Sequence, residues 1–190
     1  ERYPRRSGSN CTFLMVNGWG PIKRPFLVFE AIRNIAERYP YVRLRVGGEG
    51  PLYPEMQQFV DKYRLGGQIE LLGRLTKCEV ATELRKADYL LQPSEYETFS
   101  VICAEALCCG TPVIASNKGG IPELITEDNG LLVSINTPQG WQEVIEKVLS
   151  GEFRFADPAE ISANAISRFD KRKVGRYYAE VLEGIIHADG

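Results

Sequence analysis

Two glutamates, Glu97 and Glu105, are the residues of this chain whose type and spacing best suit chemistry. Glu97 lies in the polar stretch "SEYETFS", whereas Glu105 interrupts the apolar run "VICAEALCC". Burying a lone carboxylate costs several kcal/mol unless hydrogen-bond donors meet it. Glu105 therefore either lies at a solvent edge or beside a structural arginine, or it accepts hydrogen bonds from the hydroxyl groups of a ligand. A vicinal diol would suit its two oxygens.

Basic and glycine-rich segments offer a way to hold an anion. Lys23 and Arg24 precede a helical run, and each taken alone is typical of a surface residue at a helix start. The segments "NGWGPIKR", "GGEGP" and "NKGGIPE" each follow a short apolar run, and glycine lets backbone N–H groups approach a ligand closely. Because the net charge is −2 at pH 7, an anion would have to be held by local devices such as helix N-termini.

Short apolar runs that would position these residues recur along the chain and predict strands. They are rich in leucine and β-branched residues without strict polar alternation, as expected of strands covered on both faces. The predicted strands are 11–17, 41–47, 69–73, 88–93, 112–116 and 130–133.

Segments with helical spacing separate the strands. The predicted helices are 23–39, 51–65, 79–87, one that starts near 98–100 and carries Glu105, and three in succession at 137–151, 157–169 and 171–186. Alternating strands and helices predict an α/β fold, a doubly wound, Rossmann-like parallel sheet with helices on both faces, followed by a helical C-terminal tail. In such sheets, ligands bind beyond the carboxyl ends of the strands, where the polar and glycine-rich loops fall.

The composition excludes several classes of function. The chain has 190 residues, 44% hydrophobic and 25% charged, which is typical of one globular domain. No basic run indicates nucleic-acid binding or a membrane-surface patch, and no apolar stretch approaches the roughly 18 residues of a membrane span. Five cysteines without a C-x-x-C spacing argue against a disulfide framework and favour a reducing, cytoplasmic compartment. A single histidine argues against a His-based metal site.

Residues 88–133 resemble the donor-binding domain of retaining GT-B glycosyltransferases of the "group 1" family, which is family 4-like. The resemblance rests on the E-x7-E pair of Glu97 and Glu105, with Pro93–Ser94 and Phe99 around its first acid. It continues through "GTPV", "GGIPE" and "NGLLV", and the upstream segments "PIKRPFLVFEAI" and "VGGEGP" fall in the family's order. Together these motifs cover about residues 12–150.

The resemblance implies a role for each site residue. Glu105 would hold the ribose hydroxyls of a nucleotide, and Glu97 would contact the transferred sugar as a catalytic residue. Backbone N–H groups around Phe99, Ser100 and Val101 would open a helix N-terminus against the diphosphate.

Lys23 matches the family's phosphate lysine, which offsets charge on the leaving group, and it is the second expected catalytic residue. Gly73 and Leu75, after the third strand, match the region beside the nucleobase.

Two departures from the family pattern affect the expected phosphate site. The family usually has an arginine five residues before the lysine, where this chain has Gly18. Either Arg24 or a residue elsewhere compensates, or phosphate binding is weaker. The family's common "EGFG" is "ETFS" here, so Thr98 and Ser100 replace glycines.

Taken as a whole, the resemblance implies a retaining, hexosyltransferase-type enzyme of polysaccharide biosynthesis. It would transfer a sugar from a nucleotide-diphosphate sugar, most simply a UDP-sugar, to a glycan or lipid-linked glycan, without a metal or other cofactor. Residues 1–190 would be the donor domain, with a core at 11–150 and a tail at 151–190. The acceptor domain would precede it in a longer protein, since the chain begins at Glu1 rather than Met. This fragment alone would be inactive, and only the full-length protein would associate with the inner face of a membrane.

Other functions remain open on the sequence alone. A nicotinamide dehydrogenase shares the predicted sheet, but "NGWGPIKR" does not fit the G-x-G-x-x-G expected after its first strand. A nucleotide-sugar epimerase uses the same GT-B scaffold, and a non-catalytic nucleotide-sugar-binding module would share the motifs, so both stay as alternatives. A metal-dependent GT-A transferase is disfavoured because the sequence has no D-x-D.

Overall fold

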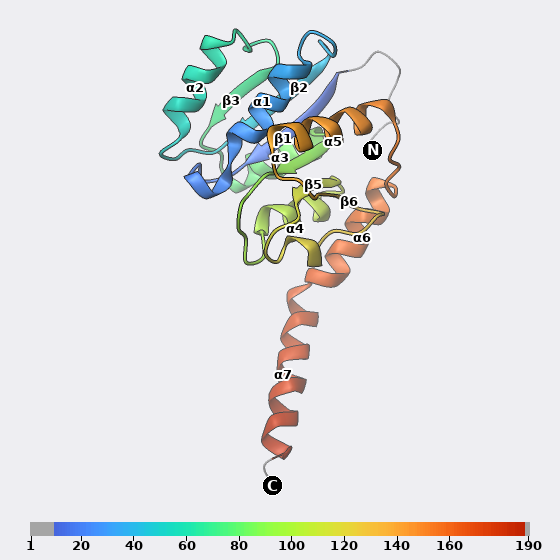
Figure 1. Cartoon of the computed structure of the whole chain (residues 1–190). Helices are drawn as coiled ribbons and strands as arrows, with labels where there is room; N and C mark the ends of the chain where they lie inside the picture. Colours follow the sequence, from blue (N-terminus) through green and yellow to red (C-terminus); the bar gives the residue numbers. More distant parts are fainter. Residues whose placement is uncertain (1–9, 189–190) are drawn as a thin grey trace.

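The computed structural model describes residues 10–188 and contains a six-stranded, all-parallel sheet between two layers of helices (Figure 1). The strand order is β3-β2-β1-β4-β5-β6, so the chain winds outward from β1 in one direction and from β4 in the other. The predicted doubly wound α/β fold is therefore confirmed. The strands are β1 (Cys11–Val16), β2 (Val42–Gly47), β3 (Ile69–Gly73), β4 (Tyr89–Gln92), β5 (Val113–Ser116) and β6 (Gly130–Val133).

Every predicted helix is present, most of them shorter than predicted. They are α1 (Pro25–Ile35), α2 (Tyr53–Lys62), α3 (Lys77–Lys86), α4 (Val101–Cys108), α5 (Pro138–Ser150), α6 (Pro158–Phe169) and α7 (Lys171–Ala188), with two 3-10 turns, η1 (Pro21–Lys23) and η2 (Ile121–Glu123). The start of α1 illustrates the difference. Lys23 and Arg24 fall outside it because Arg24 adopts a left-handed conformation, with φ 49°, and Pro25 then begins the helix.

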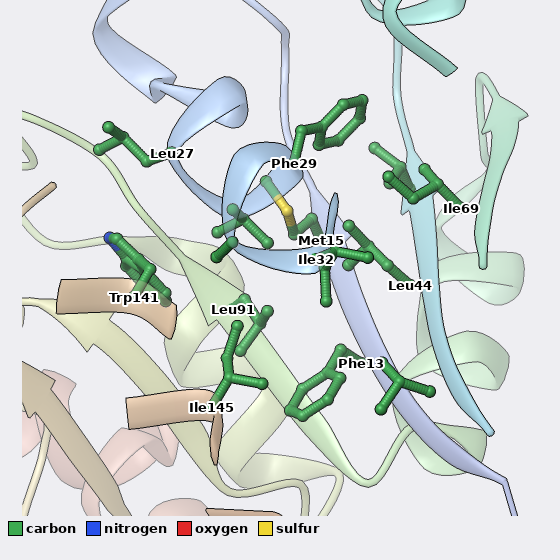
Figure 2. Close-up of a cluster of buried hydrophobic side chains, with 14 of the residues drawn as sticks. Phe13, Met15, Leu27, Phe29, Ile32, Leu44, Ile69, Leu91, Trp141 and Ile145 are labelled. Carbon is green, nitrogen blue, oxygen red and sulfur yellow. The ribbon is translucent and has the colours of Figure 1, made fainter. Parts of the chain in front are cut away.

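Both faces of the sheet are buried, which explains why the strands lack polar alternation. Successive residues of β1 point to opposite faces, and Phe13, Leu14 and Met15 are all fully buried. Phe13 and Met15 face the layer formed by α1, α2 and α5, where Figure 2 shows them beside Ile32 and Ile145. Leu14 faces the layer formed by α3, α4 and α6.

The predicted helical tail divides into two parts with different surroundings. Helix α6 packs against α4 as part of the body, whereas α7 extends away from it (Figure 1). Asp170 separates the two helices, and its carboxylate caps α7 by accepting from the N–H of Arg172 at 2.7 Å. Several large apolar side chains of α7 are exposed: Val174, Tyr177, Tyr178, Val181, Leu182 and Ile185. Among residues 10–188, none of the helices has the length and apolar character needed to cross a membrane.

Candidate active site at the switch point of the sheet

The centre of the sheet positions the predicted site residues. Strands β1 and β4 are neighbours, but the helix that follows β1 belongs to one layer and the helix that follows β4 to the other. The loops after these two strands therefore diverge and leave a cleft at their carboxyl ends, as at the switch point of other open α/β sheets. The cleft has a volume of about 430 Å³. It is lined by Val16, Asn17, Gly18, Lys23, Val80, Glu97, Ser100, Val101, Ile102 and Glu105.

Glu97 is the most strongly held acid of the cleft. Its Oε1 accepts hydrogen bonds from Lys23 Nζ at 2.5 Å, Gln92 Nε2 at 2.7 Å and Ser94 Oγ at 2.9 Å. The side chains of Lys23 and Glu97 are 22% and 13% exposed, so this ion pair is largely shielded from water. Within residues 10–188 the Oε2 atom of Glu97 makes no hydrogen bond, which leaves one carboxylate oxygen for a ligand.

Gln92 and Asn17 are site residues that sequence reasoning missed. Gln92 is fully buried at the end of β4, and its Oε1 accepts from Asn17 Nδ2 at 2.8 Å. Its Nε2 lies 3.0 Å from Ser94 Oγ and 3.2 Å from Asn17 Oδ1, in addition to its bond to Glu97. The network joins the loop after β1 to the loop after β4. The sequence does contain a signal that could have revealed them, namely a side-chain amide at the carboxyl end of each of two otherwise apolar strands.

The segment "GGIPE" supports the loop that carries Glu97. The N–H of Gly120 donates to the carbonyl oxygen of Glu97 at 2.8 Å. A Cβ on Gly119 would lie 2.0 Å from that oxygen, and one on Gly120 would lie 2.1 Å from the carbonyl oxygen of Thr98. Only glycine allows so close an approach of two backbones. This motif therefore acts in the structure through the backbone of the loop rather than by lining the cleft.

The N-terminus of α4 opens into the cleft. Ser100 precedes the helix in a left-handed conformation, with φ 64°, at a position where the resemblance noted in the sequence leads us to expect glycine. Val101 and Ile102 line the cleft, and the first N–H groups of a helix have no intrahelical partner. Together with the helix dipole they favour an anion at this end of the cleft.

Behind this N-terminus, Ser100 Oγ contacts Cys103 Sγ at 3.1 Å. Burial, with a smaller contribution from the nearby Glu97 carboxylate, raises the pKa of the Cys103 thiol to about 12, so the group is neutral at physiological pH. Cys103 therefore brings no negative charge to the site where an anion would bind.

Glu105 lies at the solvent edge of α4, which settles the question of its burial. The apolar face of this helix is formed by Cys103, Ala104, Ala106 and Leu107, and Glu105 projects from the opposite, exposed face. Its carboxylate has no hydrogen bond or ion pair to any residue in the 10–188 range. Because it borders the same cleft as Lys23, it is available to a ligand that reaches past the helix N-terminus.

Comparison with known proteins identifies the family of this chain. The family model "Glycosyl transferases group 1" matches residues 4–168. The chain belongs to this family. A relative at 35% identity over 140 residues, an uncharacterized glycosyltransferase of Methanocaldococcus jannaschii, is matched over 73% of this chain and 38% of its own length. One subunit of the phosphatidylinositol N-acetylglucosaminyltransferase of Arabidopsis thaliana is 31% identical over 65% of this chain and 28% of its own.

Solved structures share the fold. HepE of Anabaena, crystallised with UDP, superposes with a TM-score of 0.81 at 23% identity over 93% of this chain and 49% of that chain. The C-terminal domain of a group 1 glycosyl transferase from Francisella tularensis, LpcC, gives 0.71 at 24% identity over 86% of this chain and 88% of that chain. The sheet and its helices thus have the fold of a GT-B glycosyltransferase domain. The chain spans about two fifths or less of the length of the curated relatives named above.

Gly18 stands where group 1 glycosyltransferases usually have an arginine. It lines the cleft, and a Cβ built on it would meet no atom within 4 Å. The next residue, Trp19, is fully buried and donates its Nε1–H to the carbonyl oxygen of Gly47 at 3.1 Å. Trp19 therefore anchors this loop, while position 18 has open space for a longer side chain.

Arg24 and Phe99, expected at the site of this group 1 domain, lie beside the cleft rather than in its lining. Arg24 pairs with Glu95 at 3.9 Å, and both side chains are exposed. The Phe99 ring packs edge-on against Phe169 of α6, with centroids 5.7 Å apart. The loop that carries Glu97 is thereby tied to the end of α6.

Gly73 ends β3 and Leu75 follows it, and neither residue lines the cleft of the group 1 domain. The carbonyl oxygen of Gly73 accepts from the N–H of Gly48 at 2.6 Å. The Leu75 side chain packs over Gly47, where Val16 of the cleft wall also approaches. Leu75 and Val16 thus both lie close to Gly47, but Leu75 is not among the residues that line the cleft.

Neither a metal site nor the cavity beside α6 coincides with the predicted residues. Within the described range, no group of three or more His, Cys, Asp or Glu side chains is arranged to hold a metal ion. A cavity of about 270 Å³ lies between α4, α6 and the segment 124–129, and none of the predicted site residues lines it. The expectation that no metal is needed stays a prediction.

Proposed function

We propose that this chain is the C-terminal, donor-binding domain of a GT-B glycosyltransferase, and that the full-length protein transfers a sugar from a nucleotide-diphosphate sugar with retention of configuration. One observation carries the proposal. Lys23, Glu97, the N-terminus of α4 and Glu105 line a single cleft at the switch point of the sheet. This combination offers a cation and free N–H groups for a diphosphate, and two carboxylates for hydroxyl groups.

The nucleotide occupies the side of the cleft nearest α4. Its diphosphate lies against the first N–H groups of α4, at Val101 and Ile102, and Lys23 adds a positive charge from the facing loop. Glu105, one turn further along the exposed side of the helix, accepts both ribose hydroxyls. An exposed carboxylate with no protein partner in residues 10–188 suits this role, because no existing bond has to be broken.

Glu97 holds the sugar rather than attacking it. Three donors occupy its Oε1, so the carboxylate is fixed and Oε2 is left to accept one or more sugar hydroxyls. Retention through a covalent intermediate would need a carboxylate beneath the anomeric carbon. We favour front-face attack instead. The bond from the anomeric carbon to the phosphate oxygen breaks, the acceptor oxygen bonds from the same face, and the acceptor proton passes to the departing phosphate.

UDP-sugars are the favoured donors and a glycan or lipid-linked glycan the favoured acceptor. The solved structures of HepE and of pneumococcal GtfA are complexes with UDP. The Arabidopsis relative is named as acting on phosphatidylinositol. Lys23 and the α4 N-terminus supply the charge that a metal provides in other transferases, so donor binding needs no divalent cation.

Calorimetry on residues 1–190 tests the proposal. UDP, GDP and ADP, each with and without a sugar, are titrated in excess chelator. We expect binding of UDP and of a UDP-sugar without metal. If no nucleotide binds, or if every nucleotide requires Mg²⁺ or Mn²⁺, the assignment is wrong.

A further inference from the structure

We infer that Gln92 is a positioning residue for Glu97. Through this acid, Gln92 determines how much more tightly the chain binds a nucleotide sugar than it binds the nucleotide alone. The inference rests on the proposed function, because it assigns Glu97 to the sugar. Gln92 does not line the cleft and acts only through the acid that does.

The contacts of Gln92 point to this role. Its shortest hydrogen bond, from Nε2 to Glu97 Oε1 at 2.7 Å, is to the acid. The side chain is fully buried, so water cannot replace this donor. The opposite end of the amide is fixed by Asn17, whose Nδ2 donates to Gln92 Oε1 at 2.8 Å, so the amide cannot turn over without losing both bonds.

The chemistry of the amide matters as much as its shape. Lys23 and Ser94 also bond to Glu97 Oε1, but the lysine must be shared with the diphosphate and the serine hydroxyl can rotate. Gln92 is the one donor of the three that is both fully buried and fixed from behind. It therefore holds Oε1 when Lys23 turns toward phosphate, and it keeps Oε2 as the oxygen offered to the sugar.

The test compares the affinities of the chain for UDP-glucose and for UDP, measured by calorimetry, in wild type and Gln92→Leu. Loss of a hydrogen bond to a charged group should lower the ratio of the two affinities by about tenfold, with the affinity for UDP itself changed less than about twofold. If the affinity ratio of Gln92→Leu equals that of wild type, the inference is overturned and the proposed function is left intact. If the wild-type chain binds no nucleotide sugar, both the inference and the proposed function are overturned.

Gln92→Glu provides a readout that a purely structural residue would not move. The introduced carboxyl group would lie beside Glu97, so its pKa is raised. Below that pKa it is protonated and donates to Glu97 as the amide does, and above it the two carboxylates repel. Relative to wild type at the same pH, the affinity ratio of this variant should be close to normal near about pH 5.5 and fall as the pH rises to about 8. A ratio that follows wild type at every pH would contradict the inference.

Ser116→Ala is the matched control. Ser116 is buried at the end of β5 and its Oγ donates to the carbonyl oxygen of Ser94, in the loop that carries Glu97, but it makes no hydrogen bond to the Glu97 carboxylate. Removing this bond loosens the loop without removing a donor to the acid. We expect its affinity ratio to match wild type. If Ser116→Ala lowers the ratio as much as Gln92→Leu does, Gln92 is structural and the inference fails. If Gln92→Leu does not fold, as judged by thermal melting, Gln92→Glu decides the matter.

Discussion

Lys23 faces one anion in the free protein and a second in the proposed complex. Its ion pair with Glu97 is mostly shielded from water, so the pair is screened less by salt than an exposed pair would be. A diphosphate at the α4 N-terminus would draw part of this charge away from Glu97. The neutral donor Gln92, which Asn17 fixes from behind, keeps the acid in place while this happens. At the scale of residues, the site therefore separates a cation that a ligand can draw away from a neutral donor that is fixed.

Glu105→Ala should weaken nucleotide binding without changing stability. A carboxylate that accepts both ribose hydroxyls contributes roughly 1.5–3 kcal/mol, which is about tenfold or more in dissociation constant. Because Glu105 is exposed and has no partner among residues 10–188, the melting temperature should match wild type. Calorimetry with UDP measures the effect, and Glu97→Ala is the comparison, since it should spare UDP binding. Equal UDP affinity for wild type and Glu105→Ala would contradict the proposal that Glu105 binds the ribose hydroxyls.

Gly18→Arg should strengthen binding of the diphosphate. The family usually has arginine at this position, and a Cβ on Gly18 would meet nothing within 4 Å. A guanidinium that reaches the phosphates adds a charge-assisted hydrogen bond of roughly 1.5–3 kcal/mol, which is a gain of about tenfold or more in affinity for UDP. Gly67→Arg, at another open glycine away from the cleft, controls for the added charge. If both variants gain equally, the effect is one of net charge alone.

At the scale of elements, the sequence predicted the order and type of the strands and helices because continuous apolar runs and helical spacing identify them. It did not predict which side of α4 faces water. The run "VICAEALCC" is apolar nearly all round, so its exposed line through Val101 and Glu105 appears only when α6 and the sheet cover the rest. The Gln92 network escaped prediction for a similar reason, since Asn17 and Gln92 meet only through the pairing of β1 with β4.

Gly120→Ala tests how strongly the glycine pair supports the loop that carries Glu97. The added methyl would lie 2.1 Å from the carbonyl oxygen of Thr98, so one of the two backbones must shift. Overpacking of this kind typically costs about 1–3 kcal/mol. We expect urea unfolding to show a loss in this range and calorimetry to show weaker binding of UDP-glucose. Gly67→Ala, where a Cβ meets nothing within 4 Å, should be close to neutral. A Gly120→Ala variant as stable as Gly67→Ala would show that the contact is not tight.

At the scale of the whole molecule, the cleft has the groups proposed to bind the donor, but only one of its walls is supplied by this domain. The described body ends at α6, and α7 leaves it with an exposed apolar face (Figure 1). The chain covers 49% of HepE, whose fold it shares over nearly all of its own length. These facts support the proposal that the acceptor is held by a part of the full-length protein beyond this domain.

Transfer by the full-length protein, and not by residues 1–190 alone, is the final prediction. The acceptor oxygen must come within about 3–3.5 Å of the anomeric carbon for reaction, and one wall of a cleft cannot place it there. Under the proposed mechanism, Lys23 of the full-length protein would stabilise the charge that develops on the departing diphosphate. Lys23→Ala should therefore lower the rate of transfer by a factor of about 10² to 10³. NMR of the product, which reports the anomeric configuration, should show retention. An inverted product would overturn the front-face mechanism. Robust acceptor-dependent turnover by residues 1–190 alone would overturn the division of the site between two domains.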